Sequence, residues 1–278
     1  MLIPTSTPYF ESKNFTLYNG DCKEIMKSMS ENSIDMIFAD PPYFLSKSKE
    51  DMSFKGDWDL SKGVKLDTQF QYDWIKEARR ILKPEGTIWI TGTHHNIYQC
   101  GYSLQLLGFK ILNEIAWFKP KNNPFSRNFF NFAHETIIWA KKDEKSKHYL
   151  NPKVLDFKYR DKLNKEGKHM NDVWDILPCS KYEIDWHPTP KPIELLERII
   201  LSSTKPDAVI LDPFNGSGTT GIATLNLGYG RSFIGIDLDS HYLDLTIKRM
   251  EESLNTGYNK EYKGQVQRSA KSTIRENS

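Results

Sequence analysis

The sequence predicts an α/β fold with a doubly wound, mostly parallel, Rossmann-like central sheet. Apolar runs of strand length alternate with segments of helical periodicity along most of the 278 residues. Two of the strand-like runs end in an acidic residue, at Asp40 and at Asp237, at the end of a strand where ligands bind in such sheets. A third run ends at Asp212 and is followed by a glycine-rich turn and a helical pattern.

The individual elements follow from residue periodicity. Strands are expected at 15–18, 34–39, 87–91, 111–118, 135–141, 208–212 and 232–236, and helices at 22–29, 69–82, 95–107, 191–204, 218–228 and 240–254. A turn is expected at 83–86, where Pro84 and Gly86 separate a helix from a strand. Several apolar side chains at strand or helix spacing are expected in the core: Trp89, Trp117, Trp139, Leu243, Ile247, Met250 and Leu254.

Composition limits the classes of function. The formal net charge is +2, so the chain is not a generally basic binder of nucleic acid. Cys22, Cys100 and Cys179 have no spacing typical of a metal site or a disulfide framework, which favours a reducing cytoplasm. No apolar run reaches the length of a membrane span, and the first residues do not resemble a signal peptide. We therefore expect a cytoplasmic protein with no membrane partner and no metal.

The tetrapeptide Asp40-Pro41-Pro42-Tyr43 follows the apolar run 34–39 directly. Proline has a fixed φ and no N–H, so this corner cannot continue a strand and presents a carboxylate, a carbonyl and an aromatic ring. That set suits a planar amino group such as the exocyclic nitrogen of a nucleobase. The alternative is a plain strand-ending turn, because Asp-Pro is common in turns.

The second motif, Gly216-x-Gly218-x-x-Gly221, follows the strand that ends at Asp212 and opens a helix. Asp237 ends the next strand, about 20 residues later, and is placed to accept hydrogen bonds from ribose hydroxyls. The loop lacks the lysine of a phosphate-binding P-loop, which argues against an ATPase. The alternative is a glycine-rich turn that binds nothing.

Together these motifs resemble the β-class of DNA amino-methyltransferases, which modify adenine N6 or cytosine N4 with S-adenosylmethionine (SAM). The resemblance covers residues 15–255 and includes Asn19-Gly20-Asp21-Cys22 and His187-Pro188-Thr189-Pro190-Lys191-Pro192, with Pro190 where the family more often has Gln. It is similar in particular to the accessory methylases of DpnII-type restriction-modification systems. The implied sheet is of the seven-stranded methyltransferase type, with the catalytic motif preceding the cofactor motif in a circularly permuted order.

The resemblance implies roles for individual residues. Catalysis is expected at Asp40, Pro41, Pro42 and Tyr43, with hydrogen bonds from the amino group to the Asp40 carboxylate and the Pro41 carbonyl. The expected cofactor-binding residues are Asp21, His187, Lys191, Asp212, Pro213, Phe214, Gly216, Ser217, Gly218, Thr219, Thr220 and Asp237. The target base must leave the duplex to be reached, and Tyr43 with Phe44 would stack on it.

Asp at the first motif position favours adenine N6 over cytosine N4. A nucleotide-binding oxidoreductase using NAD is the alternative from another class, but it leaves the tetrapeptide without a role. The expected partner is double-stranded DNA, with GATC as a guess for the site. A cognate restriction endonuclease and a homodimer are kept open.

Four regions are expected along the chain. Residues 1–142 form the catalytic half, 143–186 contact DNA and choose the target, 187–255 form the SAM-binding half, and 256–278 are a polar tail. The second region is basic and aromatic, and Lys158, Arg160 and Lys162 are its expected DNA contacts. The alternative interpretation of residues 143–186 is a solvated surface segment that binds no partner. Residues 44–68 read as a long loop over the substrate, with Trp58 under it or against DNA. His94 and His95 are expected to be structural.

Overall fold

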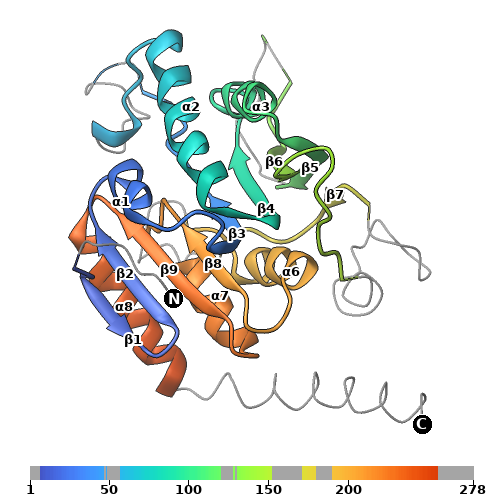
Figure 1. Ribbon diagram of the computed structural model, residues 1–278. Coiled ribbons are helices and arrows are strands. Elements are labelled where there is room, and N and C mark those ends of the chain that lie inside the picture. Colours follow the sequence, from blue (N-terminus) through green and yellow to red (C-terminus); the bar gives the residue numbers. More distant parts are fainter. Residues whose placement is uncertain are drawn as a thin grey trace.

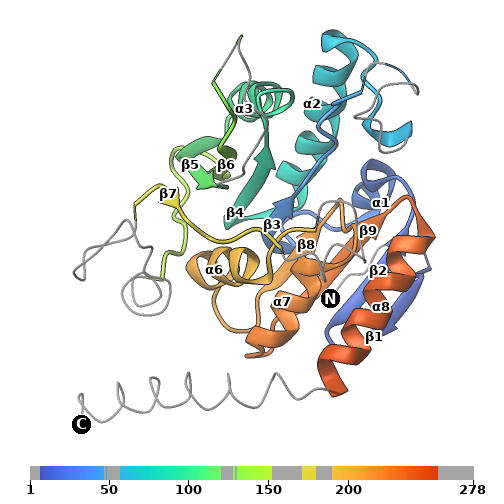
Figure 2. The ribbon, with the colours of Figure 1, turned by 180° about the vertical axis from the view of Figure 1, so that it is seen from behind.

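A computed structural model describes residues 7–46, 48, 57–119, 128, 130–151, 171–179 and 190–255. Within these residues one sheet runs through the whole molecule (Figures 1 and 2). Its strands are β1 (Phe10–Ser12), β2 (Phe15–Asn19), β3 (Ile34–Ala39), β4 (Leu82–Gly92), β5 (Lys110–Phe118), β6 (His134–Lys141), β7 (Val173–Trp174), β8 (Val209–Asp212) and β9 (Ser232–Asp237). The helices are α1 (Cys22–Ser28), α2 (Val64–Ile81), α3 (Ile97–Leu106), α6 (Ile193–Ser203), α7 (Thr219–Leu227) and α8 (Ser240–Asn255), with a 3-10 turn at Asp57–Asp59.

The strand order explains how two distant motifs meet. The order is β1-β2-β9-β8-β3-β4-β6-β5-β7, and the five strands from β2 to β4 are parallel. Strands β6 and β5 continue the sheet in antiparallel pairing. β3 and β8 are direct neighbours, with Met36 paired to Ile210 and Ile37 to Leu211. The ends of these two strands therefore present Asp40 and Asp212 at the same edge, and the expected α/β fold is confirmed.

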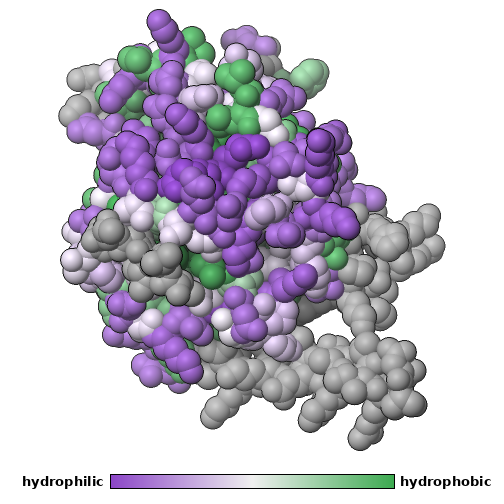
Figure 3. All heavy atoms as spheres, viewed as in Figure 1, coloured by the Kyte–Doolittle hydropathy of each residue, from purple (hydrophilic) through white to green (hydrophobic). Residues whose placement is uncertain are grey.

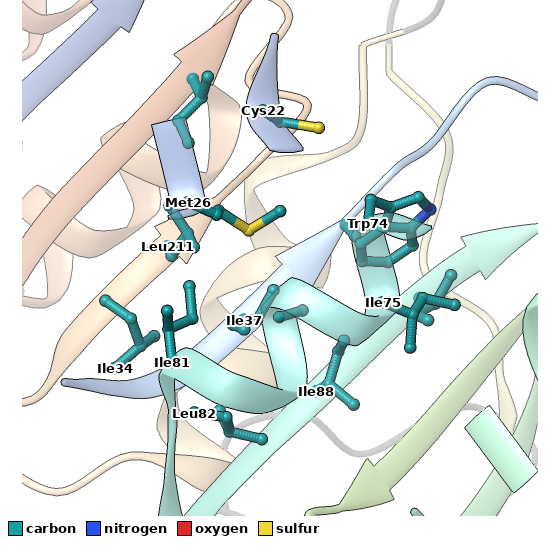
Figure 4. Close-up of a cluster of buried hydrophobic side chains, with 14 of the residues drawn as sticks. Cys22, Met26, Ile34, Ile37, Trp74, Ile75, Ile81, Leu82, Ile88 and Leu211 are labelled. Atoms are coloured by element: carbon teal, nitrogen blue, oxygen red, sulfur yellow. The ribbon is translucent and has the colours of Figure 1, made fainter. Parts of the chain in front are cut away.

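Helices cover both faces of the sheet. α1, α2 and α3 pack on one face, where Met26, Trp74, Ile75 and Ile81 are fully buried against the strands (Figure 4). In α2 the buried positions 74, 75, 78 and 81 recur at the spacing of one helical stripe. α6, α7 and α8 bury the other face over a second cluster that includes Trp89, Trp117 and Trp139. Burial of these tryptophans confirms the expectation drawn from their strand-like runs.

Several expectations about the elements were wrong in detail. α2 begins at Val64 and not at 69, so the second part of the expected 44–68 loop is helical. In its first turn Val64 and Leu66 are exposed to solvent. The apolar residues of this turn therefore do not continue the buried stripe, and the sequence pattern did not reveal the start of the helix. The expected turn at 83–86 lies inside β4, where pairing jumps from Leu82 to Thr87 in a bulge. Leu254 is 55% exposed and is not a core residue.

Two strands were not expected. β1 has three residues and β7 has two, which is too short for an alternating pattern to be recognised. Both lie at the ends of the sheet and pair with only one neighbour.

The face of the molecule in Figure 3 is largely hydrophilic, with scattered apolar patches. Among the described residues, none of the helices has the length and apolar character that crossing a membrane requires.

Candidate active site

A cavity of about 930 Å³ opens at the carboxyl ends of the parallel strands. Asp40 after β3, Asp212 at the end of β8 and Asp237 at the end of β9 all line it. Most of the expected site residues that the structure describes line the same cavity: Asp21, Asp40, Pro41, Pro42, Tyr43, Phe44, Lys191, Asp212, Pro213, Phe214, Gly216, Ser217, Thr219, Thr220 and Asp237. The two motif-bearing halves of the chain thus form one site.

The Asp40 carboxylate is held from three sides. Its Oδ1 accepts hydrogen bonds from the Tyr43 hydroxyl at 2.8 Å and from Thr91 Oγ1 at 2.5 Å, and its Oδ2 accepts from Lys191 Nζ at 2.5 Å. Burial alone would raise the pKa of Asp40, but the Lys191 ammonium and the hydroxyl donors hold this pKa below its usual value. Asp40 is therefore a carboxylate at neutral pH, suited to accepting hydrogen bonds and poorly suited to acting as a base.

The carbonyls of the two prolines differ in their hydrogen bonds. The Pro42 carbonyl accepts hydrogen bonds from Gln71 at 3.3 Å and from Asn96 at 3.4 Å. No hydrogen bond to the Pro41 carbonyl comes from the described part of the chain, and Pro41 lines the cavity. This arrangement leaves the Pro41 oxygen available next to the Asp40 carboxylate.

Asp59 fixes the backbone that follows the tetrapeptide. Its carboxylate is 1% exposed and accepts the backbone N–H groups of Tyr43, Phe44 and Leu45 at 2.9, 2.7 and 3.4 Å. Phe44 has φ of +57°, which L-residues rarely adopt. Three donors converging on one buried carboxylate stabilise this unusual turn. The residue was not predicted, because it lies in the segment interpreted as an irregular loop.

The ammonium of Lys191 pairs with the Asp40 carboxylate. The side chain is 9% exposed, and its ammonium is 3.9 Å from Glu135 Oε2 and 5.4 Å from the centre of the Tyr43 ring. Glu135 in turn pairs with Lys119 through Oε1 and lies 3.4 Å from the Tyr43 hydroxyl. A chain of alternating charges, Lys119–Glu135–Lys191–Asp40, thus lines this end of the cavity.

The glycine loop is held against α8. Gly218 has φ of +78°, and a Cβ there would lie 2.3 Å from Thr246 Cγ2, so only glycine fits. Arg249 donates to the Ser217 carbonyl at 2.6 Å and to Thr219 Oγ1 at 3.2 Å. Neither Thr246 nor Arg249 was predicted, since both lie on α8, where only apolar spacing was considered.

Two acidic residues at the loop have raised pKa values. Burial raises the pKa of Asp212 to about 7, although its carboxylate accepts from Thr220 Oγ1 at 2.6 Å and from the Phe214 N–H at 3.0 Å. Burial also raises the pKa of Asp237 to about 6, and its Oδ2 accepts the Gly216 N–H at 2.7 Å. Both carboxyl groups change charge near neutral pH.

Other expected residues have more ordinary surroundings. Asp21 caps α1 by accepting the Lys23 N–H at 2.8 Å and also lines the cavity. Phe44 packs edge-on against Phe70 on α2, and Trp58 lines the cavity at 41% exposure. The rings of His94 and His95 lie 3.9 Å apart at an angle of 37°, and the described residues contain no cluster of three or more side chains able to hold a metal ion. Four expected residues lie outside the described residues: Lys158, Arg160, Lys162 and His187.

This geometry can be compared with known proteins. The family described as DNA methylase, of the N6/N4 type, matches residues 34–248, which span the cavity from β3 to α8. The chain belongs to the DNA methylase family. Type II methyltransferase M2.MboI of Moraxella bovis is 46% identical over 259 residues, covering 88% of this chain and 91% of that protein. M2.DpnII of Streptococcus pneumoniae is 44% identical over 261 residues, covering 90% and 94%.

Solved structures agree with this DNA methylase assignment. The complex of M1.HpyAVI with SAM has a TM-score of 0.61 and 28% identity, covering 85% of this chain and 98% of that one. The cytosine-N4-specific PvuII DNA methyltransferase has a TM-score of 0.68 over 94% and 97%, but at 19% identity it shows the fold alone. The expectations of a DNA methyltransferase with SAM as its cofactor are thereby confirmed.

Proposed function

We propose that this DNA methylase transfers the methyl group of SAM to the N6 amino group of adenine in a short DNA sequence, after the target base has left the duplex. The observation that carries the proposal is the convergence of the Asp40 carboxylate, the Pro41 carbonyl and the glycine loop in one cavity. A carboxylate beside a carbonyl is an acceptor pair for the two N–H bonds of an aromatic amino group.

The residues of the cavity fit SAM. Its volume lies within the range of about 300–1,000 Å³ that is usual for ligand sites. Asp21 and Asp237 offer acceptors for the adenine amino group and the ribose hydroxyls, while Ser217 and Thr219 face the methionine end. Gly218 lets the loop backbone pack directly against Thr246 of α8, which fixes the shape of the loop that lines the cavity. When bound, SAM supplies an electrophilic methyl group.

The chain contributes position and charge. The Asp40 and Pro41 oxygens would hold both N–H bonds of the target amino group, which favours a tetrahedral nitrogen with a localised lone pair. Because Asp40 keeps a low pKa, it stabilises the positive charge that builds on nitrogen without having to remove a proton first. Tyr43, which lines the cavity beside Asp40, would stack on the base.

Adenine is preferred because the motif begins with Asp40, where the cytosine-N4 enzymes of this class more usually have Ser. Cytosine N4 remains the second candidate, since the matched family includes both chemistries. An NAD-dependent oxidoreductase is disfavoured by the family match. We infer that residues 143–186 contact DNA and that His187 and Lys191 belong to the motif preceding α6.

The biological setting is part of the same proposal. The relatives are named type II methyltransferases, which supports a restriction-modification role with a cognate endonuclease. Action on DNA is consistent with the cytoplasm of a bacterial cell. A homodimer would show as a doubled mass by light scattering of the purified protein.

Single-molecule sequencing of DNA from a host that expresses the chain tests base, position and site together. N6-methyladenine in one short motif is expected, and it should vanish in a host that expresses Asp40→Ala instead. Methylation at cytosine in the same comparison would select the second candidate. DNA without any modified base in the parent host would overturn the proposal.

A further inference from the structure

Residues of the chain engage three of the about four acceptor positions of the Asp40 carboxylate. Its Oδ1 accepts from Tyr43 and Thr91, and its Oδ2 accepts from Lys191 at 2.5 Å. Lys191 Nζ is a nitrogen donor, as is the target amino group. Lys191 therefore donates to the Asp40 carboxylate an N–H hydrogen bond of the same kind as the one that we assign to the target amino group.

The surroundings of Lys191 offer its ammonium a second partner. Glu135 Oε2 is 3.9 Å away, so a displacement of little more than one ångström would bring the two groups to hydrogen-bond distance. Pro192, the residue after Lys191, occupies the N-cap position of α6 with φ of −64°, so the backbone at this point is restricted and the displacement falls on the Lys191 side chain. Glu135 itself is anchored on β6 and held by Lys119.

Charge gives a reason for the displacement. Two cations, Lys191 and Lys119, balance the two carboxylates of Asp40 and Glu135. Other titratable groups that act on these four residues include Asp212, Tyr43 and Cys179. During methyl transfer, positive charge builds on the amino nitrogen. An ammonium that stayed on Asp40 would repel this charge at close range and would occupy its acceptor. An ammonium held by Glu135 leaves Asp40 Oδ2 open to the amino group.

Building on the proposed function, we infer that Lys191 holds the place of the target amino group on Asp40 until the base arrives, and that Glu135 is the positioning residue that then takes up the ammonium. Glu135 acts through Lys191 and does not touch the reacting atoms. It was not predicted as a site residue because the sequence places it only in the expected strand 135–141.

A double-mutant cycle tests this exchange. Initial rates of transfer of labelled methyl groups to a plasmid free of prior methylation are measured for the parent, Glu135→Gln, Lys191→Met and the double variant. Glu135→Gln should lower the rate at saturating DNA by about 10-fold or more, because the ammonium then has only Asp40 to pair with. In the Lys191→Met background the same change should alter the rate less than about twofold, because no ammonium is left to reposition.

The pH profile separates this role from simple packing. Without Lys191 the buried Asp40 loses its cation and its pKa rises, so the acid limb of the rate profile should move up by about 1–3 pH units. Glu135→Gln removes a negative charge instead, and its acid limb should not move up. Asp35→Asn is the matched control: it breaks the 2.7 Å ion pair with Lys83 at the opposite end of β3 and should leave the profile unchanged.

Folding is verified by thermal melting and by SAM affinity, and Lys191→Gln replaces Lys191→Met if the latter does not fold. An equal loss from Glu135→Gln in both backgrounds would overturn the exchange and make Glu135 a packing residue. An unmoved acid limb in the Lys191 variant would overturn it as well. A parent protein without adenine methylation would instead be a failure of the proposed function.

Discussion

The carboxylate of Asp59 accepts the backbone N–H of Phe44 at 2.7 Å while Phe44 is held at φ of +57°. The same carboxylate accepts the neighbouring N–H groups of Tyr43 and Leu45. Asp59 lies nineteen positions beyond Asp40 and holds the turn that orients the tetrapeptide Asp40–Tyr43. Asp59 contacts backbone N–H groups here, so we expect its carboxylate to fix the geometry of the turn and not to touch the substrate.

Asp59→Ala should therefore reduce methyl transfer strongly while leaving the affinity for SAM within a few-fold. Leaving buried N–H groups without acceptors costs about 1–3 kcal/mol, and the melting temperature should fall accordingly. Initial rates of methyl transfer measure the loss of activity, and calorimetry measures the affinity for SAM. Asp57→Ala, in the same 3-10 turn but exposed, is the control, and an equal loss there would contradict the assignment.

Asp40→Ala should abolish methyl transfer, because it removes the acceptor of the target amino group. Removing a transition-state interaction of this kind costs about 100-fold or more in rate. Calorimetry should show nearly unchanged binding of SAM, since Asp40 lies after β3 and the glycine loop after β8. Activity within a few-fold of the parent would show that the carboxylate does not hold the amino group.

The affinity for SAM should rise as pH increases from 6 to 7. Burial raises the pKa of Asp237 to about 6 and of Asp212 to about 7, and bound SAM brings a positive charge that favours their ionised forms. Binding therefore releases protons in this range, which calorimetry in buffers of different ionisation enthalpy measures. Asp237→Asn should weaken binding and flatten its pH dependence. NAD should give no saturable heat.

These same carboxyl groups affect stability in the opposite direction. Because their folded pKa values are raised, the folded state binds more protons than the unfolded state between about pH 4 and pH 7. The protein without cofactor should thus lose stability as pH rises through this window. Denaturant midpoints at three pH values measure the effect, and a midpoint that rises over the same range in the absence of SAM would contradict the raised pKa values.

Gly218→Ala should weaken SAM binding and stability together. The new Cβ would meet Thr246 Cγ2 at 2.3 Å in a backbone with φ of +78°. Gly108→Ala is the matched control, since Gly108 has φ of +81° but its Cβ would meet nothing closer than 3.9 Å. The control should lose only the strain of the left-handed backbone, about 1–2 kcal/mol, and should keep its SAM affinity. Equal losses of SAM affinity would show that the contact with α8 does not shape the loop.

Charge removal at Lys158, Arg160 and Lys162 should weaken DNA binding and flatten its dependence on salt. Removing one phosphate-binding cation lowers the log–log slope by about one unit, while SAM affinity should not change. Equal slopes for the parent and the triple variant would move the DNA contacts to residues 44–68 or to residues 121–131 with Lys121 and Arg127.

Much of the fold followed from local pattern. Strand and helix positions were recognisable because buried stripes such as Trp74, Ile75 and Ile81 recur at helical spacing. The motifs Asp40–Tyr43 and Gly216–Gly221 were recognisable because they combine unusual backbone residues with acids at strand ends. Their meeting in one cavity followed from the resemblance and from the rule that ligands bind at the carboxyl ends of strands.

The supporting residues could not be recognised in this way. Asp59, Glu135 and Arg249 act through contacts with residues far away in sequence or with backbone groups, and a single polar residue in a loop, strand or helix carries no such signal. Lys191 was assigned to the cofactor from its motif, whereas its ammonium is paired with Asp40. Only tertiary packing decides which of two nearby ligands a long side chain reaches.

The strand order also has a consequence for how the protein is made. β8 and β9 lie between β2 and β3 in the sheet, yet they are synthesised after nearly everything else. Until the ribosome has passed residue 237, β2 and β3 have open edges that face a gap of two missing strands. Open edges of this kind invite pairing with other chains, and such long-range pairing is slow. Nascent chains should therefore depend on chaperones for most of their synthesis, and methylation can begin only when the last strands close the sheet.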